Sequence, residues 1–564
     1  MAKKILVVGG VAGGASAAAR CRRLSEEDEI IMFEKGPHVS FSNCSLPYYL
    51  SGTVARAEDL VLMTPEKFRG QYNIDARVRH EVISIDRENR QVEVRDLESG
   101  ETYRESYDKL VLSPGARPVV PPIPGMEKAN VFTIRNVVDI EKLKQAIDRI
   151  RPTRVTIVGG GFIGIEVAEN LVEAGQKVSL VEAAPQILAQ FDDEMVQILH
   201  KELLDQGVDL VVGDRVEAFD TDTVVLSSGR RISSEVVVLS IGVQPESELA
   251  DKAGLQLSEA GFIKVDHNYR TADPDIYAVG DAIEVYFPLS GQYGSLALAG
   301  PAQRQARAVA DHIHGIPVHY GGYIGSSVVK VFGYNAASTG VNERQLRQMG
   351  ASFEHVMIVP KDKVGLMPDS EELHFKILFE KPTGRILGAQ AIGRGNVDKR
   401  IDVIATAISA KASVDQLKHL ELCYAPPFGS AKDVVNMAGY VASNILHGTF
   451  QQVRVNDIRK LHDAGAFILD VREQEEWDAG HLLRAHHVPL SELRQRLDEI
   501  PTDQPVYVHC RSGQRSYSAV CALQHRGYDQ VFNVSGGYLG ICFYEYFRDK
   551  TLDRPPIVSA YDFQ

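Results

Sequence analysis

Cysteine is scarce in this sequence, and the few cysteines do not form obvious pairs. The 564 residues include six, at positions 21, 44, 423, 510, 521 and 542. None lies in a CxxC pair or at the spacing of a zinc site, which argues against a disulfide scaffold and a structural zinc module. We therefore predict no metal site. In a reducing compartment, isolated cysteines are either buried core residues or reactive thiols.

Long apolar runs and an excess of positive charge are also lacking. No stretch is long enough to span a bilayer, and Met1–Ile5 leads directly into an expected strand, so we expect a cytoplasmic protein without membrane insertion. The formal net charge of −14 argues against general nucleic-acid or anionic-membrane binding, although a local basic pocket remains compatible with it. The length predicts roughly three or four domains.

The first glycine-rich turn has the order of a Rossmann dinucleotide-binding unit. A buried apolar strand over 4–8 precedes Gly9–Gly14, and a small-residue helix and a second strand ending in Glu34 follow. In such units the turn and the helix N-terminus hold a pyrophosphate, while the acid about 20 residues on accepts from ribose hydroxyls. Val11 replaces the central glycine, but the strand–turn–helix context still predicts a site that includes Gly9, Gly14 and Glu34.

Two later segments extend this first site. An expected buried strand over 110–112 runs into a turn that contains Gly115, and a strand over 276–279 ends at Asp281 before a helix. A carboxylate at that place can accept from a hydroxyl of a ribityl chain, and the helix dipole can face a phosphate or a flavin. We add Gly115 and Asp281 to the first site and expect it to hold FAD.

A second Rossmann unit begins at a complete GxGxxG motif. The strand over 154–158 leads into Gly159, Gly161, Phe162 and Gly164, and the next strand ends in Glu182. That acid favours NADH over NADPH, because it accepts from a free 2′-hydroxyl and repels a 2′-phosphate. Phe162 either packs in the loop or gates the flavin. Two such units in one chain predict bound FAD and a transient NAD, with electrons passing on to a thiol.

One cysteine stands alone in the polar segment 40–49, just before Pro47. No second cysteine lies near Cys44 in the sequence, so a redox reaction there needs a sulfur partner from a small molecule or from elsewhere in the chain. Arg20 and Arg23 lie three residues apart on the first expected helix and share a face. That face is either solvated or holds the phosphates of a ligand.

These residues together resemble a known family. The two Rossmann units, Asp281 and the lone Cys44 are similar to the single-cysteine branch of the pyridine nucleotide-disulfide oxidoreductases, which includes coenzyme A-disulfide reductases, NADH oxidases and peroxidases, and persulfide reductases. The resemblance covers roughly residues 1–445. It implies an FAD domain split between 1–150 and 265–320, an NAD domain at 151–264 and an α+β dimerisation domain at 321–445.

The resemblance also implies roles for individual residues. Cys44 would be the redox thiol, and Tyr424 and Lys432 would complete the site of the partner subunit in a homodimer. A tyrosine hydroxyl can donate to a thiolate or protonate a leaving thiol. The positions that match the coenzyme A ligands of the coenzyme A-disulfide reductases are Ser16, Arg20, Arg23, Ser40 and Asn43.

Two differences from the motifs of the family indicate which of its members this sequence resembles most. Ala12 stands where the oxidases and peroxidases carry a histidine beside the flavin, which disfavours oxygen or peroxide chemistry at a cysteine sulfenate. The stretch Gly365–Asp369 lacks the second tyrosine of the coenzyme A-disulfide reductases. The latter departure leaves room for a sulfur acceptor other than coenzyme A disulfide.

The pattern changes after the expected linker at 446–455. A compact α/β unit at 456–550 contains a short strand over 506–509, then Cys510 in a loop that opens a helix. Backbone N–H groups, the helix dipole, Arg511 and Arg515 would lower the pKa of such a thiol and stabilise a persulfide anion. The unit resembles a single-domain rhodanese, although a phosphatase-type loop has the same geometry. Residues 551–564 form a tail.

We therefore predict an α/β protein with two Rossmann-like domains, a dimerisation domain and a rhodanese-like domain. The expected reaction is NADH-dependent reduction of a persulfide, polysulfide or coenzyme A-linked disulfide, with FAD as cofactor and Cys510 carrying sulfane sulfur. Coenzyme A would bind as ligand or substrate. The alternatives are an NADH oxidase or peroxidase, and a redox sensor or sulfur-carrier protein. The substrate would be a small thiol, disulfide or persulfide, without nucleic acid or membrane.

Overall fold

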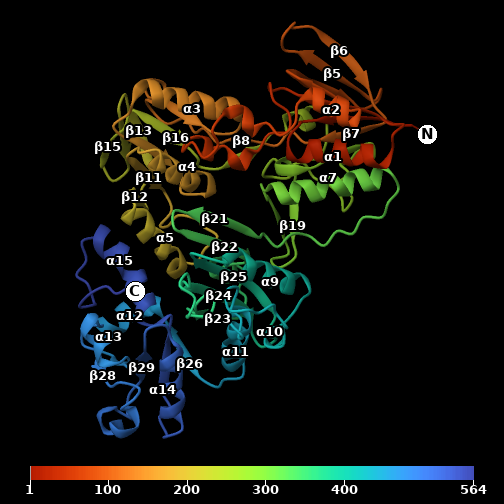
Figure 1. Ribbon diagram of the computed structural model, residues 1–564. Coiled ribbons are helices and arrows are strands. Elements are labelled where there is room, and N and C mark those ends of the chain that lie inside the picture. Colours follow the sequence, from red (N-terminus) through yellow and green to blue (C-terminus); the bar gives the residue numbers. More distant parts are fainter. Residues whose placement is uncertain (1, 564) are drawn as a thin grey trace. The chain divides into compact units, whose positions relative to one another are not determined.

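The computed structural model describes residues 2–563 (Figure 1). The chain divides into two compact units, Met1–Pro185 with Val211–Tyr323, and Gln186–Leu210 with Ile324–Gln564. Among the described residues, no helix combines the length and the apolar character needed to cross a membrane.

A parallel sheet forms the core of the first nucleotide-binding part. Its strand order is β18-β7-β1-β2-β3, with β18 (Ile276–Ala278), β7 (Lys109–Leu112), β1 (Lys4–Val8), β2 (Glu29–Glu34) and β3 (Asp75–Val78). The apolar residues of β1 and β2 are almost fully buried, as expected for strands covered on both faces. Helices α1 (Ala12–Leu24) and α7 (Ala299–Ile313) lie side by side against this sheet (Figure 1).

The second Rossmann unit repeats this design. Strands β11, β10, β16 and β9 are parallel neighbours, with β11 (Val178–Glu182), β10 (Val155–Val158), β16 (Val236–Leu239) and β9 (Val131–Thr133). Helix α4 (Phe162–Glu173) follows the glycine-rich turn. In both Rossmann units the glycine-rich turn therefore joins the carboxyl end of a central strand to the N-terminus of a helix. Ligands of open α/β sheets bind at this edge of the sheet.

An antiparallel sheet organises the middle of the second unit. Its order is β21-β22-β25-β24-β23, with β21 (Ser327–Val331), β22 (Tyr334–Gly340), β25 (Ile386–Gly393), β24 (Leu373–Glu380) and β23 (Phe353–Ile358). Helices α9 (Val397–Ser409) and α11 (Val434–Leu446) pack against it. Every residue of β25 is buried, so this strand lies at the centre of the layer.

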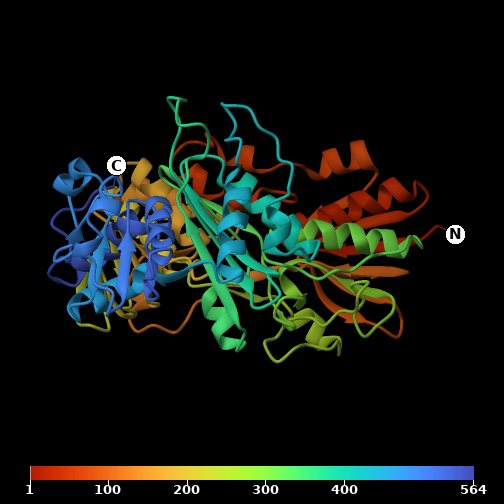
Figure 2. The ribbon, with the colours of Figure 1, turned by 90° about the horizontal axis from the view of Figure 1, so that it is seen from below.

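The last part of the chain, blue in Figure 2, forms one compact α/β lobe. Its parallel sheet has the order β26-β30-β29-β27-β28, with β26 (Gln451–Arg454), β30 (Val531–Ser535), β29 (Val506–His509), β27 (Phe467–Asp470) and β28 (His486–His487). Helices α12 (Val455–Asp463), α14 (Gln514–Gln524) and α15 (Gly537–Thr551) complete the lobe.

Two segments outside the expected 456–550 unit belong to this lobe. The stretch 446–455, expected as a linker, contains β26, which pairs in parallel with β30. Its sequence is Gln-Gln-Val-Arg, and β26 lies at the edge of the sheet, where polar residues are tolerated. These residues lack the apolar alternation by which a strand is predicted from sequence. The tail beyond 551 is packed as well, since Ile557 and Val558 are buried and Val558 forms a β-bridge with Leu482.

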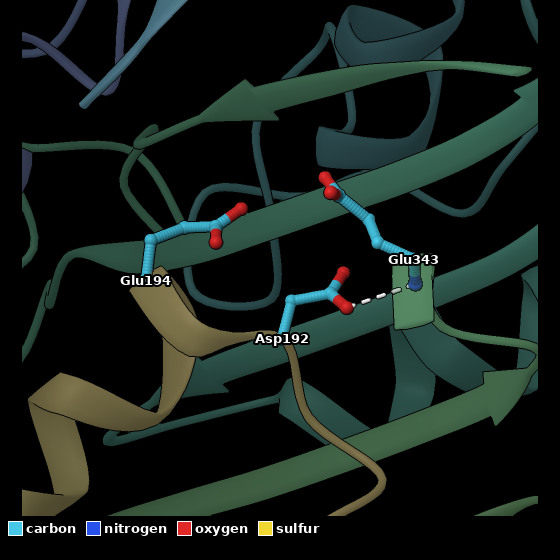
Figure 3. A group of neighbouring side chains, drawn as sticks. All are labelled: Asp192, Glu194 and Glu343. Atoms are coloured by element: carbon cyan, nitrogen blue, oxygen red, sulfur yellow. Dashed lines mark hydrogen bonds between the residues drawn. The ribbon is translucent and has the colours of Figure 1, made fainter. Parts of the chain in front are cut away.

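A buried ion cluster links three parts of the second unit (Figure 3). Asp192 and Glu194, at the start of α5 (Asp193–Asp205), and Glu343, the first residue of α8 (Glu343–Gln348), offer carboxylate oxygens within 4.8 Å of one another. The fully buried ammonium of Lys376, on β24, pairs with all three carboxylates. Arg454, from the C-terminal lobe, also pairs with Glu343. A lysine thus occupies the centre of this acidic group.

Candidate active sites

Backbone packing makes glycine necessary at both ends of the first glycine-rich loop. Gly9 has φ +95°, and a Cβ there would lie 2.0 Å from the carbonyl oxygen of Ser113. A Cβ at Gly14 would lie 1.8 Å from the carbonyl oxygen of Gly9. Such distances exclude any side chain, so these glycines bring α1 close to β1.

The acid at the end of β2 is held by the backbone of the same loop. The Glu34 carboxylate accepts hydrogen bonds from the N–H of Gly10 at 2.9 Å and of Gly36 at 2.8 Å. Each oxygen keeps further acceptor capacity. The carboxylate is therefore fixed at the mouth of the loop and can accept from the hydroxyls of a ribose.

The second loop has the same construction and one additional opening. Gly159 has φ +109°, and a Cβ at Gly164 would lie 1.9 Å from the carbonyl oxygen of Gly159. A Cβ at Gly161 would meet no described heavy atom within 4 Å, so the backbone there is open to a close ligand. Phe162 is the half-buried first residue of α4. This open N-terminus is suited to a pyrophosphate.

Glu182, the acid of the second Rossmann unit, is held by backbone N–H groups in the same way as Glu34. Glu182 accepts from the N–H of Gly160 and of Ala184, both at 2.7 Å. Its negative charge is therefore placed beside the loop, where it suits a 2′-hydroxyl and opposes a 2′-phosphate.

Gly115 and Asp281 lie in the same unit as these loops. Gly115 has φ +76°, and the nearest group to its hypothetical Cβ is the Arg135 guanidinium at 3.7 Å. Asp281 lies in the 3₁₀ turn Gly280–Ala282, where burial raises the pKa of its carboxyl and the charge of Arg135 opposes that rise. An open glycine backbone and an acid that lacks strong partners for its charge fit a bound FAD, which offers phosphates and ribityl hydroxyls.

Cys44 is exposed in the short 3₁₀ helix Asn43–Ser45. The hydroxyls of Ser42 and Ser45 bond each other at 2.8 Å on either side of it. Partial burial of the sulfur, and then the negative charges of Glu166 and Asp281, raise the pKa of the Cys44 thiol. The thiol is thus accessible, and its conversion to thiolate is opposed by the protein groups around it.

Ser40 connects the cysteine segment to the first nucleotide loop. Its N–H donates to the carbonyl oxygen of Gly10 at 2.7 Å, and its own carbonyl accepts from the N–H of Leu62 at 2.9 Å. Its φ of +53° lies in the left-handed region, which is unfavourable for a serine. Strain of this kind persists where surrounding contacts impose it and is concentrated at functional sites.

The predicted phosphate-binding arginines have different environments. The Arg20 guanidinium pairs with Asp311 of α7 at 2.7 Å. Arg23 is exposed, and its guanidinium lies 6.0 Å from the ring centre of Tyr72. Ser16 lies half-buried on the same helix, α1. A phosphate at this helix would therefore compete with Asp311 for Arg20.

Glu166 is a further residue near Cys44 that the sequence motifs did not predict. Burial, together with the charge of Glu169, raises the pKa of the Glu166 carboxyl to about 7. Its helix, α4, is tied to the segment after Cys44 by a hydrogen bond of 2.7 Å from the Ser51 hydroxyl to the Asn170 side chain. The signal available in the sequence was an acid between two apolar residues of the helix, at a position where a charge costs free energy.

Tyr424 and Lys432 lie on an exposed loop of the second unit. The Tyr424 side chain is 51% exposed and that of Phe428 is 67% exposed. A second exposed loop lies beside this one, since the N–H of Val364 donates to the carbonyl oxygen of Gly429 at 3.2 Å. Large exposed side chains on adjoining loops mark a surface suited to a partner.

Cys510 lies at the end of β29 in a cradle of donors. Its side chain is 1% exposed, and its sulfur accepts from the N–H of Gly513 at 3.2 Å. The Ser516 hydroxyl lies 3.5 Å from the same sulfur and 2.6 Å from the amide oxygen of Asn533. The Gly513 N–H points at the place where negative charge would sit on a thiolate or a persulfide, and the single Ser516 proton would have to turn from Asn533 to reach it.

Both arginines of this loop are paired with carboxylates that the sequence analysis did not identify. Arg515 makes two hydrogen bonds of 2.6 Å to Glu476. Arg511 donates to Glu372, at the start of β24, at 2.7 Å. The two acids partly neutralise the charge that we expected the arginines to bring to the sulfur. Because each partner is distant in sequence, spacing gave no signal.

The remaining cysteines differ in burial. Cys21 and Cys542 are fully buried, and burial raises the pKa of each thiol to about 12. These two cysteines are therefore buried core residues rather than accessible thiols. Cys521 is half-buried and Cys423 is exposed.

Three family models match successive segments of the chain. The family described as pyridine nucleotide-disulphide oxidoreductase matches residues 3–306, and the dimerisation domain of that family matches residues 326–434. The rhodanese-like domain family matches residues 455–542. A coenzyme A disulfide reductase of Staphylococcus epidermidis is 34% identical over 447 residues, which cover 78% of this chain and 99% of that protein.

Solved structures resemble the chain over almost its whole length. The reduced CoADR-RHD of Bacillus anthracis is 45% identical, with 97% of this chain and 99% of that chain covered and a TM-score of 0.94. A NAD-dependent persulfide reductase from A. fulgidus is 34% identical, with coverages of 95% and 99% and a TM-score of 0.90. These matches confirm the expected family and fold class, and the chain belongs to the pyridine nucleotide-disulphide oxidoreductases, with a rhodanese-like domain after the dimerisation domain.

Proposed function

We propose that this protein is an FAD-dependent enzyme that uses NADH to reduce a persulfide, a polysulfide or a coenzyme A-linked disulfide. The observation that carries the proposal is the exposed Cys44, which lies in the same unit as two complete dinucleotide-binding loops and has no disulfide partner among the described residues. The relatives named above, a coenzyme A disulfide reductase and a persulfide reductase, act on the same class of sulfur bond.

Each of the two glycine-rich loops would bind a different dinucleotide. Gly9, Gly14, Glu34, Gly115 and Asp281 would hold FAD. The second loop would hold NADH, with Glu182 disfavouring the 2′-phosphate of NADPH. Bound FAD supplies the chemistry that passes two electrons from NADH to a sulfur bond.

Cys44 would make and release a mixed disulfide. Its thiolate attacks the inner sulfur of a persulfide RS–SH, which forms Cys44–S–S–R and expels hydrosulfide. Two electrons and one proton then return the thiolate and the free thiol RSH. The net reaction converts a persulfide, NADH and a proton into a thiol, hydrogen sulfide and NAD⁺. Because Cys44 needs no second protein cysteine in this cycle, its isolation is consistent with the chemistry.

Coenzyme A is the thiol carrier that the basic residues suggest. Ser16, Arg20, Arg23, Ser40 and Asn43 all lie in the unit that contains Cys44. Arg20 would exchange Asp311 for a phosphate, a contact of comparable charge-assisted strength. The match to coenzyme A disulfide reductases supports this ligand.

A homodimer would complete the site. Tyr424, Phe428 and Leu366 are 51%, 67% and 86% exposed, and a partner subunit would cover such side chains. The dimerisation-domain match at residues 326–434 includes this region. Tyr424 would then protonate the leaving thiol in the partner's site, and Lys432 would approach the phosphates of coenzyme A.

The C-terminal lobe would carry sulfane sulfur on Cys510. The N–H of Gly513 and the Ser516 hydroxyl can stabilise the anionic form of a Cys510 persulfide. Arg511 and Arg515 would orient the donor.

The test is anaerobic NADH oxidation with coenzyme A disulfide, coenzyme A persulfide and polysulfide, measured for wild type, Cys44→Ser and Cys510→Ser. We expect Cys44→Ser to lose at least about 1,000-fold in turnover with every acceptor, because its hydroxyl is a poor nucleophile toward sulfur. Cys510→Ser should keep full activity with coenzyme A disulfide. Full activity of Cys44→Ser with all three acceptors would refute the proposal, and rapid oxygen consumption in air would favour an oxidase.

A further inference from the structure

A hairpin of the dimerisation domain, residues 361–372, contacts two loops to which we assign different chemistry. Its strands are joined by hydrogen bonds from the N–H of Asp362 to the carbonyl oxygen of Glu371 at 2.8 Å, and from the N–H of Leu373 to that of Pro360 at 2.9 Å. At its base, the Glu372 carboxylate accepts from Arg511, the residue that follows Cys510. This ion pair is half-buried, with 32% and 21% of the two side chains exposed.

The same hairpin is attached to the loop that carries Tyr424 and Lys432. Val364 donates its N–H to the carbonyl oxygen of Gly429. The buried Arg400 guanidinium donates both to the carbonyl oxygen of Asp362 at 2.9 Å and to the Asp433 carboxylate at 3.1 Å. Asp433 in turn caps α11 by accepting from the N–H of Val435 at 3.0 Å. Three separate contacts therefore hold this hairpin and the Tyr424 loop in one arrangement.

We propose that the 361–372 hairpin positions the sulfur-carrying loop for transfer to the thiol substrate, and that Glu372 is the positioning residue that links the two. The inference rests on the proposed function and deepens it. Glu372 lies outside the rhodanese-like domain and pairs with Arg511 of its Cys510 loop. Within the lobe, the Arg511 guanidinium lies 3.9 Å from the Asp562 carboxylate, whereas it lies 2.7 Å from Glu372, so the shorter pair is the one that ties the Cys510 loop to another domain.

The step that Glu372 assists is a sulfur transfer between two thiols. The persulfide anion on Cys510 has an outer sulfur, and the thiolate of the substrate, RS⁻, attacks that sulfur. The S–S bond of Cys510 breaks, the Cys510 thiolate leaves with the electron pair, and RS–S⁻ forms and takes a proton from water. RS–SH is then the substrate for reduction at Cys44. A shift of about 1 Å in the attacked sulfur would slow such an in-line attack strongly, whereas loading of Cys510 from a small diffusible donor tolerates it.

The experiment separates loading from transfer. Cys510 is loaded with polysulfide, excess donor is removed under anaerobic conditions, and the loaded sulfur is counted by cyanolysis. Coenzyme A and NADH are then added together, and the single-turnover consumption of NADH is followed. Glu372→Gln is compared with Glu371→Gln, which removes the same charge from the exposed neighbouring residue.

Glu372→Gln should load normally and transfer about 10-fold more slowly than wild type, with unchanged reduction of coenzyme A disulfide. Glu371→Gln should match wild type. In an Arg511→Gln background, Glu372→Gln should add nothing further, because the pair is already broken. A general folding defect would reduce loading as well.

Equal transfer rates in Glu372→Gln and Glu371→Gln would overturn the inference and leave the proposed function intact. A wild type whose NADH consumption equals that of Cys510→Ser would refute the sulfur-carrying role itself, and the inference with it.

Discussion

The two cysteines to which we assign chemistry are treated in opposite ways by the protein around them. Cys44 is exposed, and burial of its sulfur and the nearby charges of Glu166 and Asp281 raise the pKa of its thiol. Cys510 is buried, the N–H of Gly513 points at its sulfur, and the Ser516 hydroxyl lies 3.5 Å from that sulfur. The protein therefore opposes negative charge at the Cys44 sulfur and directs a backbone N–H donor at the Cys510 sulfur.

This difference indicates which partner completes each site. At Cys510 the loop itself supplies the N–H of Gly513, so in the proposed function a persulfide would be held there without a further ligand. At Cys44 the protein supplies access and leaves stabilisation of the thiolate to bound groups. In the proposed function these are the flavin, the thiol substrate and Tyr424 of a partner subunit. An acceptor site that becomes reactive only when it is filled avoids loss of electrons to unrelated disulfides.

The largest effect that would test the comparison is expected for Gly537→Ala. Gly537 has φ +60°, and a Cβ there would lie 2.5 Å from the carbonyl oxygen of Arg511 and 2.6 Å from that of Cys510. The substitution must displace the backbone of the cradle, so we expect sulfur loading of Cys510 to fall about 100-fold. Reduction of coenzyme A disulfide through Cys44 should be unchanged. Cyanolysis and NADH oxidation measure the two outcomes.

Gly527→Ala is the control for Gly537→Ala. Gly527 has φ +88°, and its hypothetical Cβ meets no described heavy atom within 4 Å, so this variant carries the backbone strain without the collision. If both variants load sulfur equally well, the cradle does not depend on the backbone as we describe it.

A medium effect is expected at Cys44 from Glu166→Gln. The pKa of Glu166 is about 7, so above pH 7 its carboxylate is ionised and disfavours the Cys44 thiolate. Glutamine removes that charge, which lowers the pKa of Cys44 and speeds alkylation by iodoacetamide a few-fold above pH 7. Well below pH 7 the wild-type carboxyl is protonated, and the two proteins should converge. The measurement is the alkylation rate against pH in the absence of NADH.

The matched variant for this prediction is Glu173→Gln, at the exposed end of the same helix. It should leave the alkylation profile of Cys44 at the wild-type values. A Glu166→Gln profile that moves to higher pH, or does not move, would contradict the electrostatic account of Cys44.

The smallest effect is expected from Ser516→Ala. The hydroxyl is one of the donors near the Cys510 sulfur, and the loss of one hydrogen bond corresponds to about 1 kcal/mol, or a slowing of about fivefold in loading. Ser518→Ala, on the exposed side of α14, should have no effect. If Ser516→Ala and Ser518→Ala load sulfur onto Cys510 at the same rate, the Ser516 hydroxyl does not contribute to holding the sulfur there.

The order of domains and both nucleotide loops could be predicted because their signals are local. Gly9 and Gly159 stand directly after apolar strands, and Glu34 and Glu182 end the next strands, so spacing alone predicts the Rossmann units. The structure adds the reason that glycine is needed at Gly14 and Gly164, where a side chain would collide with backbone. Residue roles taken from the family resemblance, such as those of Tyr424 and Lys432, stay predictions.

The features that sequence reasoning missed depend on contacts between distant segments. Glu372 and Glu476 are unremarkable surface acids until the fold places them on Arg511 and Arg515. The strand β26 was hidden for a related reason, because an edge strand of polar residues has no hydrophobic alternation to detect.

The ion cluster around Lys376 bears on whether the C-terminal lobe can be separated from the rest of the chain. Lys376 and Glu343 of the dimerisation domain form a buried cluster with Asp192 and Glu194, and Arg454 of the C-terminal lobe pairs with Glu343. Arg548 of α15 pairs with Asp193, the neighbouring acid, at 2.5 Å. Cutting the chain after 446 would remove Arg454 from Glu343, which keeps Lys376 and Arg347, and would remove Arg548 from Asp193, whose side chain is 40% exposed. The C-terminal lobe is thus tied by ion pairs to acids outside it, and a chain cut after 446 should melt at a lower temperature than the whole protein.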